Sequence, residues 1–242
     1  MRIFDLHTHV IPCVDDGADS SKTALEMLEN AADSHVEVLV ATPHCNLPGW
    51  YENYKTSELI NKFQTLKADA ESADIPLSLL LGSEVHATWD LLRLLNEGKI
   101  LTLNDSRYLL TEFPVDAASD FYSEMLKKLL ALGYVPLIAH PERYMAVWET
   151  PEIVMKWLDW GCHLQLTAGS VLGEFGRKVK KTSDFLLKED LVACIASDAH
   201  DARTRTNFLG NMYTHLCLNY SQEYAMTLLW DNPLRICRNE AL

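Results

Sequence analysis

Short hydrophobic runs alternate with longer amphipathic segments along the whole chain. The runs have the length and aliphatic composition of buried strands, and they cover residues 3–6, 36–41, 77–81, 108–111, 135–139, 163–167 and 191–196. Helical periodicity fills the stretches between and after them, at residues 21–34, 54–73, 119–132, 151–160, 178–188, 206–217 and 221–229. The helix at 119–132 opens with Ser119, which we expect to cap it. Strict alternation of strands with helices predicts a parallel sheet, either open or closed.

Polar side chains mark the carboxyl ends of the predicted strands. In a closed barrel these ends form one rim, where catalytic residues collect, whereas an open sheet spreads them along a line too long for one cluster. We therefore expect an α/β fold, a distorted (β/α)7 barrel like the TIM barrel. No linker, repeat or low-complexity stretch divides the chain, so a single domain over residues 1–242 is predicted.

Two pairs of these polar residues share a spacing that suits metal binding. His7 and His9 lie two positions apart after the first strand, and Asp198 and His200 do so after the last. In a strand, residues i and i+2 point the same way, so each pair aims two ligands at one point. Imidazole and carboxylate without thiolate suit Mn, Fe or Zn. The full candidate set is too large for one ion and predicts two or three: His7, His9, Asp16, His44, Glu84, Glu112, His140, Asp198 and His200.

Some of these positions also have simpler explanations. Asp16 suits a turn, and Asp15 is the alternative ligand. Asp198 suits the N-cap of the following helix. Burying a carboxylate without a partner is costly, so cations explain Glu84 and Glu112 better. The other histidines are expected to be surface or satisfied core residues: His35, His86, His163 and His215.

Two arginines follow ligand candidates closely in the sequence, namely Arg143 after His140 and Arg205 after His200. A guanidinium binds phosphate in a bidentate way and offsets charge in the transition state. Clustered cations about 3.5–4 Å apart stabilise both the attacking and the leaving oxygen in displacement at phosphorus. These features predict phosphoester hydrolysis. Each arginine has a simpler alternative role: Arg143 could form an ion pair with Glu142 or Glu149, and Arg205 with Asp201. Arg203 competes with Arg205 as the phosphate ligand.

Composition limits the partners and the cellular location expected for this protein. The net charge of −13 argues against a nucleic-acid groove, which needs clustered Lys and Arg. No secretory signal is recognised, and no run of about 18 apolar residues predicts membrane insertion. The six cysteines form no C-x-x-C pair and suit free thiols in a reducing cytosol, so a cytoplasmic location is expected. The sequence predicts no particular oligomeric state.

The cysteines also exclude one class of phosphatase. The cysteine-dependent tyrosine phosphatases need Cys-x5-Arg, and no cysteine here has arginine six positions on. An amidohydrolase is an alternative, since it also begins with His-x-His in a barrel. That class bridges its metals with lysine, however, where this chain offers Glu84 and Glu112. A metal-binding interaction module without turnover is a further alternative, and the two arginines disfavour it.

The motifs around these residues resemble those of the polymerase-and-histidinol-phosphatase (PHP) superfamily. They run in order along the chain: Asp-Leu-His-Thr-His at 5–9, Val-Asp-Asp-Gly-Ala at 14–18, Thr-Pro-His at 42–44, Gly-Ser-Glu at 82–84, Thr-Glu-Phe-Pro at 111–114, His-Pro-Glu-Arg-Tyr at 140–144 and Ser-Asp-Ala-His at 197–200. Val-Asp-Asp-Gly, His-Pro-Glu-Arg-Tyr and Leu-Thr-Ala-Gly-Ser at 166–170 more narrowly resemble the capsule-associated bacterial tyrosine phosphatases, the CpsB/CapC group. Cys13 and Cys45 depart from that pattern, and we expect them to be inert.

The resemblance implies a PHP-type barrel and a trinuclear site that usually holds Mn2+. On the matching positions, one ion is held by His7, His9, Glu84 and Asp198, a second by Glu84, Glu112 and His140, and a third by Asp16, His44 and His200. Arg143 and Arg205 then bind the substrate phosphate, and a metal-bound hydroxide attacks phosphorus without a phosphoenzyme. The implied substrate is a phosphotyrosine protein, the tail of a bacterial tyrosine kinase in capsule or exopolysaccharide synthesis. Histidinol phosphate or another small phosphate is the alternative substrate.

Overall fold

The computed structural model describes residues 1–242 and contains nine strands. They are β1 (Ile3–Thr8), β2 (Val36–Ala41), β3 (His44–Cys45), β4 (Ser78–Leu81), β5 (Glu84–His86), β6 (Tyr108–Glu112), β7 (Val135–Ala139), β8 (His163–Thr167) and β9 (Cys194–Ala196). All seven predicted runs form strands. The two additional strands, β3 and β5, follow β2 and β4 after short breaks. At two and three residues they are too short to leave a periodic pattern in the sequence.

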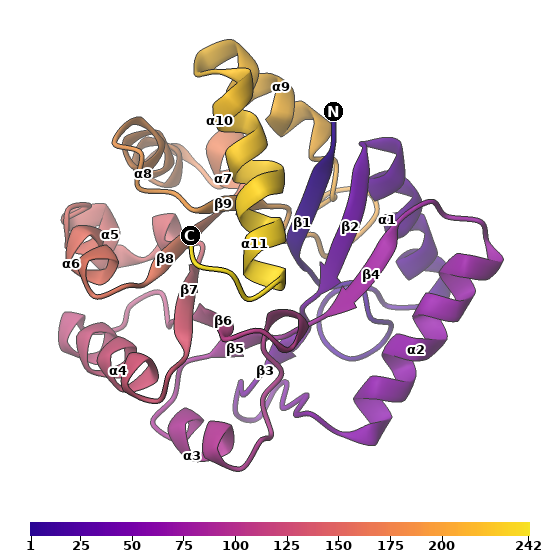
Figure 1. The fold of residues 1–242 in the computed structure, drawn as a ribbon, viewed down its shortest axis with the longest axis horizontal. Helices are drawn as coiled ribbons and strands as arrows, with labels where there is room; N and C mark the ends of the chain where they lie inside the picture. The colour runs from indigo at the N-terminus through magenta and orange to yellow at the C-terminus, as the bar shows by residue number, and fades with distance from the viewer.

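Hydrogen bonds divide the strands into two parallel sheets, with the orders β1-β2-β4 and β3-β5-β6-β7-β8-β9. The predicted α/β class and parallel direction are therefore confirmed, while the ladders form two sheets rather than one closed sheet. The first and last strands also meet, because Asp198 N donates to His7 O and His9 N donates to Ala199 O, both at 2.9 Å. Figure 1 shows the strands around a common centre, with most of the helices outside them.

Each predicted helical segment contains a helix. The α-helices are α1 (Ser21–Asp33), α2 (Ser57–Ser72), α3 (Leu91–Asn96), α4 (Ser119–Ala131), α5 (Met145–Glu149), α6 (Ile153–Asp159), α7 (Ala168–Leu172), α8 (Arg177–Lys188), α9 (Gly210–Asn219), α10 (Gln222–Met226) and α11 (Asn232–Cys237). Of these, α3, α5, α7 and α11 were not predicted. The segment predicted as one helix at 221–229 is instead α10 followed by a π-helical turn, Thr227–Asp231. The predicted cap at Ser119 is wrong: the extended residue before α4 is Ala118, which has no capping side chain.

Two hydrophobic clusters lie on opposite faces of the strands, and successive residues alternate between them. Phe4 and Leu6 belong to an inner cluster of 14 buried residues, while Ile3 belongs to a cluster of 52 between strands and helices. The C-terminal segment covers the inner cluster at the amino ends of the strands. Trp230 packs edge-on against Phe4 with ring centroids 6.1 Å apart, and Arg2 lies 4.0 Å above the Trp230 ring. Figure 1 shows α11 in front of this centre.

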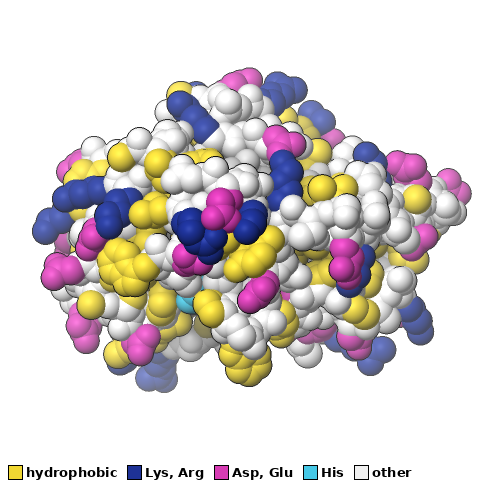
Figure 2. Space-filling view, turned by 90° about the horizontal axis from the view of Figure 1, so that it is seen from below, with side chains coloured by type: hydrophobic (Ala, Val, Ile, Leu, Met, Phe, Trp, Pro, Cys, Tyr) yellow, Lys and Arg dark blue, Asp and Glu magenta, His cyan; other side chains and the backbone are white.

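The surface carries charges of both signs. Figure 2 shows basic and acidic side chains mixed on the face that it draws, with hydrophobic side chains between them. That face offers no continuous basic stripe of the kind that nucleic-acid binding needs. None of the helices combines the length and the apolar character required to cross a membrane.

Candidate metal centre

Four ligand candidates come together where β1, β4 and β9 end. The Nε2 atoms of His7 and His9 lie 3.1 Å apart, because both side chains leave the end of β1 in the same direction. Glu84 Oε2 lies 3.2 Å from His7 Nε2 and 3.3 Å from His9 Nε2. Asp198 Oδ1 lies 3.5 Å from both nitrogens. All four side chains are buried, so the donor atoms face one another rather than water.

A second group lies around Glu84 and contacts both of its carboxylate oxygens. Glu84 Oε1 lies 2.8 Å from His140 Nε2, and Glu112 Oε1 lies 3.8 Å from the same nitrogen. His44 Nδ1 approaches Glu84 Oε2 at 3.1 Å, and donor atoms of His44, Glu84 and Glu112 all lie within 4.8 Å of one another. Glu84 is therefore the central residue of the cluster.

A third group lies where the cluster opens to solvent. His44 Nε2 and His200 Nε2 lie 3.5 and 3.6 Å from Asp16 Oδ1, and the Asp16 side chain is 50% exposed. The His9 ring lies 4.0 Å from that of His200 and joins this group to the first. The fold thus brings all nine predicted ligand candidates into one site.

The donor atoms fit metal ions. Atoms that share an ion at about 2.0–2.2 Å are about 3–3.5 Å apart, and the first group has this spacing. Glu84 Oε2 and His44 Nδ1 are buried, and although they lie 3.1 Å apart neither has a partner in hydrogen-bond geometry. A buried carboxylate oxygen without a hydrogen bond is costly, and a cation relieves that cost. Imidazole and carboxylate donors suit Mn, Fe or Zn.

The thiols beside the ligands have other surroundings. Cys45 is buried with its Sγ directed at Glu52 O, 3.4 Å away, and burial raises its pKa to about 12. It is therefore protonated at neutral pH, and the thiolate that binds metal is absent. Cys13 is exposed, and its Sγ donates to Asp19 O at 3.0 Å. Neither thiol belongs to a group of converging metal ligands.

Charged neighbours determine the protonation of the buried ligands. Burial acts to raise the pKa of Asp198, but His7 and Arg143 hold it well below its usual range. Burial, together with the positive charge of His9, lowers the pKa of His200 to about 2. Asp198 is therefore ionised and His200 neutral, which are the states in which these two side chains bind metal. Burial acts to lower the pKa of His7 and His9, but the neighbouring carboxylates raise it, so metal binding there displaces protons.

A match over almost the whole chain identifies its family. The family model described as "Capsular polysaccharide synthesis, CpsB/CapC" matches residues 3–238. The chain belongs to the CpsB/CapC family. The resemblance drawn from its motifs is confirmed.

Relatives of this CpsB/CapC chain match over their full length. Tyrosine-protein phosphatase YwqE of Bacillus subtilis is 34% identical over 99% of this chain and 93% of that protein. Tyrosine-protein phosphatase CpsB of Streptococcus pneumoniae is 31% identical over 99% of this chain and 100% of that one. A solved structure from work on YwqE and CpsB as metal-dependent tyrosine phosphatases has a TM-score of 0.91, at 31% identity over 99% of this chain and 96% of that one. The phosphotriesterase homology protein of Escherichia coli, with a TM-score of 0.62 at 12% identity over 96% of this chain and 97% of that one, shares the fold alone.

The two predicted arginines of this CpsB/CapC chain converge on one ligand. Arg143 Nη2 and Arg205 Nη2 lie 2.8 and 2.9 Å from the same oxygen, Asp198 Oδ2. The Nε atoms of both arginines are buried and have no hydrogen-bond partner. N–H donors therefore remain available for an anion beside the cluster.

Two of the competing partners, Glu142 and Asp201, accept hydrogen bonds from backbone N–H groups. Glu142 Oε1 accepts a hydrogen bond from Thr167 N at 2.9 Å. Asp201 accepts from the backbone N–H groups of residues 203, 204 and 205, so it shapes the loop rather than pairing with the Arg205 guanidinium. The Arg203 side chain is exposed. The arginine that reaches the cluster from this loop is Arg205.

Two residues outside the predicted set orient the histidines. Asp15 Oδ2 lies 2.8 Å from His9 Nδ1 and accepts from His44 N at 2.9 Å. Gln165 Oε1 lies 3.0 Å from His7 Nδ1. A partner at Nδ1 leaves Nε2 facing the cluster, which is how outer residues orient metal ligands. A glutamine inside the buried strand β8 was the available sequence signal for Gln165.

The surroundings of the site hold two further features. His86, expected at the surface or in the core, lies beside the cluster with its Nδ1 3.0 Å from Glu112 Oε2. His140 and Asp198 both have left-handed backbones, with φ of 34° and 52°. Such a conformation costs a non-glycine residue about 1–3 kcal/mol and recurs at functional sites. Strain at two ligand positions therefore coincides with the proposed chemistry.

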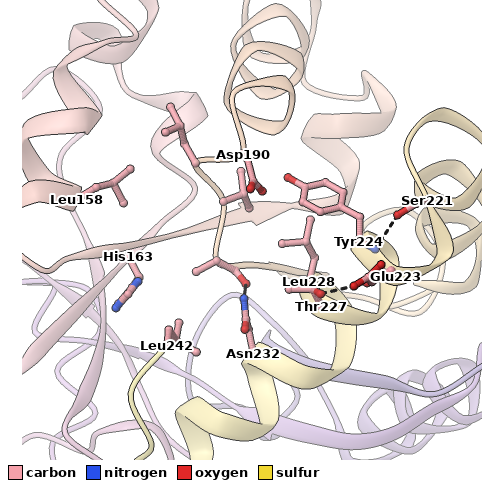
Figure 3. A pocket seen from close by; sticks show the side chains of 13 residues that line it. Leu158, His163, Asp190, Ser221, Glu223, Tyr224, Thr227, Leu228, Asn232 and Leu242 are labelled. Atoms are coloured by element: carbon pink, nitrogen blue, oxygen red, sulfur yellow. Dashed lines mark hydrogen bonds between the residues drawn. The ribbon is translucent and has the colours of Figure 1, made fainter.

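A separate hollow lies at the amino ends of β8 and β9 (Figure 3). Two of its polar groups already have partners: the Tyr224 hydroxyl donates to Leu187 O at 3.1 Å, and Asn232 Nδ2 donates to Ala193 O at 2.8 Å. His163 lines this hollow half-buried, in agreement with its expected place at the surface or in the core. No group of converging metal ligands lies here.

Proposed function

We propose that the chain is a metal-dependent protein-tyrosine phosphatase. The observation that carries this proposal is the convergence of Arg143 and Arg205 on Asp198, a buried carboxylate of the histidine cluster. Guanidinium groups beside a cation site suit a transferring phosphoryl group. Full-length relatives named tyrosine-protein phosphatases support phosphotyrosine as the substrate. The carboxylate of Glu84 lies between the first and second ligand groups, where an amidohydrolase has a lysine, and this disfavours an amidohydrolase.

The proposed ligand sets share Glu84. His7, His9, Glu84 and Asp198 hold one ion, Glu84, Glu112 and His140 hold a second, and Asp16, His44 and His200 hold a third. Asp16 is preferred to Asp15, because Asp15 is hydrogen-bonded to His9 Nδ1, on the side of the ring opposite the cluster. Mn2+ is the proposed metal, in two or three ions. When bound, the ions polarise the phosphoryl oxygens and lower the pKa of water.

The side chains bind and orient the substrate in this proposal. Arg143 and Arg205 hold the phosphoryl oxygens through their unpaired N–H groups and offset the charge that develops in the transition state. Asp15 and Gln165 keep two of the imidazole rings turned toward the cluster. Phenolate, with a pKa of about 10, leaves with little help from a general acid. Cys45 is protonated and does not serve as a nucleophile.

The proposed architecture is a distorted (β/α)7 barrel of the PHP type, in a single domain of residues 1–242. The pairs β2–β3 and β4–β5 each take one position in the ring, so nine strands fill seven positions. The hydrogen bonds of His9 with Ala199 and of Asp198 with His7 support closure between the first and last positions.

The proposed substrate protein is the tail of a bacterial tyrosine kinase that controls capsule or exopolysaccharide synthesis. The family description, which names capsular polysaccharide synthesis, supports this setting. The proposed location is the cytoplasm. Six cysteines without a disulfide support a reducing compartment.

A substrate panel tests this function. With Mn2+, we expect kcat/KM for a phosphotyrosine peptide to exceed that for a phosphoserine peptide or histidinol phosphate by about tenfold or more. Elemental analysis of the purified protein should find two or three metal ions per chain. Equal or reversed rates would overturn the tyrosine assignment, and full activity after metal removal would overturn the metal site.

A further inference from the structure

One aromatic ring lies against both arginines of the site. The ring centroid of Phe175 lies 4.1 Å from Arg143 Cζ and 6.0 Å from Arg205 Cζ. Both guanidinium groups also reach the same oxygen of Asp198. The face of an aromatic ring attracts a guanidinium, which stacks on it. Phe175 therefore helps to fix the direction of both groups, while their Nε donors stay unpaired.

The same ring borders an open hollow. Phe175 is 37% exposed and lines this hollow together with Arg205 and Asp198. Phe208 lines the hollow as well, but its ring lies over no cation. The hollow thus joins a buried ligand carboxylate, a guanidinium and an aromatic wall. A substrate whose phosphoryl group lies at the arginines would bring an attached aromatic ring next to that wall.

The loop between α7 and α8 holds the ring in this position. Gly173 and Gly176 flank the tip of the loop with φ of 94° and 90°, which glycine adopts without strain. Glu174 N donates to Gly169 O at 2.9 Å, so the tip folds back onto α7. A Cβ atom on Gly169 would lie 2.5 Å from Glu174 Oε2 and 2.9 Å from Phe175 Cε2. The glycine of the Leu-Thr-Ala-Gly-Ser motif therefore makes room for the ring.

We propose that Phe175 makes the site selective for aryl phosphates, an inference that rests on the phosphatase function proposed above. Its exposed surface is one on which an aromatic leaving group can stack, whereas an alkyl phosphate such as phosphoserine has no ring to place there. Its contact with the guanidinium groups sets where the phosphate lies relative to that surface. An aromatic contact of this kind changes affinity by about 2- to 10-fold. Phe175 acts as a specificity-determining residue.

Two phosphonates that are not hydrolysed test the contact by binding alone. Phenylphosphonate and methylphosphonate carry the same anionic group and differ in the ring. Calorimetry on the metal-loaded protein should give about tenfold tighter binding of the phenyl compound, and Phe175→Ala should reduce this preference to about twofold. Tyr220→Ala is the matched control, because Tyr220 is 38% exposed and lies outside the site. An unchanged preference in Phe175→Ala would overturn the proposal, as would an equal loss in Phe208→Ala.

Kinetics separate this role from a merely structural one. Phe175→Ala should raise KM for a phosphotyrosine peptide about 5- to 10-fold, lower kcat by a smaller factor and affect a phosphoserine peptide less. Phe175→Tyr should keep the wild-type KM, whereas Phe175→Leu, apolar without a π face, should behave like the alanine variant. Gly169→Ala, which displaces the ring, should raise KM as well. Equal KM values in the tyrosine and leucine variants would contradict the proposal.

Measurements on the wild-type protein separate failure of this inference from failure of the proposed phosphatase function. If it hydrolyses no phosphotyrosine peptide yet prefers phenylphosphonate, the phosphatase function fails and the aryl selectivity stands as a binding property. If it hydrolyses the peptide and Phe175→Ala matches it in both KM and phosphonate preference, the function stands and the role of Phe175 is wrong.

Discussion

The two ends of the same strands are built from opposite kinds of side chain. At the amino ends, Phe4 packs against Trp230 in an inner apolar cluster under α11. At the carboxyl ends, His7, Glu84 and Asp198 are buried mainly against one another and against further charged groups. Burying charges costs stability, and apolar burial at the other end offsets that cost. One end therefore carries stability and the other carries the proposed chemistry, which is the division that barrel rims favour.

Removing a ligand should disturb the carboxyl end alone. His140→Ala takes away the imidazole between Glu84 and Glu112, so we expect kcat to fall by about 10³-fold or more. The free energy of unfolding should change by less than about 2 kcal/mol. Steady-state kinetics and urea unfolding on the same preparation check both values. Unchanged kcat would count against the metal site, and a much larger loss of stability would break the division between the two ends.

Removing an apolar contact should disturb the amino end alone. Trp230→Ala leaves a cavity beside Phe4, and it should lower the free energy of unfolding by about 3–5 kcal/mol. The kcat of the folded fraction should stay within about twofold. Leu218→Ala is the control, because Leu218 is exposed and its loss should leave stability nearly unchanged. A fall in kcat that matches the His140 variant would show that the two ends are coupled.

The outer residues of the metal site sharpen the comparison. Asp15→Asn weakens the partner of His9 Nδ1, so we expect Mn2+ affinity to fall by about 10- to 100-fold with the fold kept. A titration followed by calorimetry measures the dissociation constant. Asp16→Asn in parallel should lower the number of ions bound. If Asp15→Asn instead lowers that number and Asp16→Asn does not, Asp15 is the ligand.

Removal of Arg205 should have a smaller effect on activity. Arg205→Ala removes one of two guanidinium groups at Asp198, so kcat/KM for a phosphotyrosine peptide should fall about tenfold. Arg203→Ala, two positions away and exposed, is the matched control. An unaltered value for Arg205→Ala together with a loss for Arg203→Ala would move the phosphate role to Arg203.

The smallest effect concerns pH at the amino end. Burial and the nearby Arg107 lower the pKa of His163, so the unfolded chain binds a proton more readily than the folded chain. The folded state therefore loses stability as pH falls below about 6.5, the ordinary pKa of histidine. Urea unfolding near pH 7.5 and pH 5.5 should show a larger loss in wild type than in His163→Gln. An equal loss in both proteins would exclude His163 as the cause.

Regular patterns made much of the fold predictable. β2, β7 and β8 were predicted to the residue, because each is a buried run between clear helical segments. β3 and β5 were missed, since two or three residues carry no period. The predicted helix at 221–229 was wrong in detail, because a π-helical turn replaces its last residues at Thr227–Asp231. The sequence did not reveal this turn, since its apolar residues still follow helical spacing.

The metal site shows the same limit at the level of single residues. His7, His9 and Asp198 stood out because paired spacing at a strand end is visible in one dimension. Asp15 and Gln165 touch histidines through contacts that only the folded chain creates, 6 and 158 positions apart in the sequence. No sequence pattern marks Phe175, because its proposed role depends on its contact with Arg143 and Arg205 in the folded chain.

The meeting of β1 with the segment after β9 sets an order for assembly. Ser197 donates to His7 O across 190 positions of chain, and a ribosome adding about 5–20 residues per second needs about 10–40 s to make that stretch. Throughout that time the emerging chain contains His7 and His9 but lacks Asp198, the carboxylate that completes their ligand group. The ligand set of His7, His9, Glu84 and Asp198 is therefore complete only once Asp198 has been made.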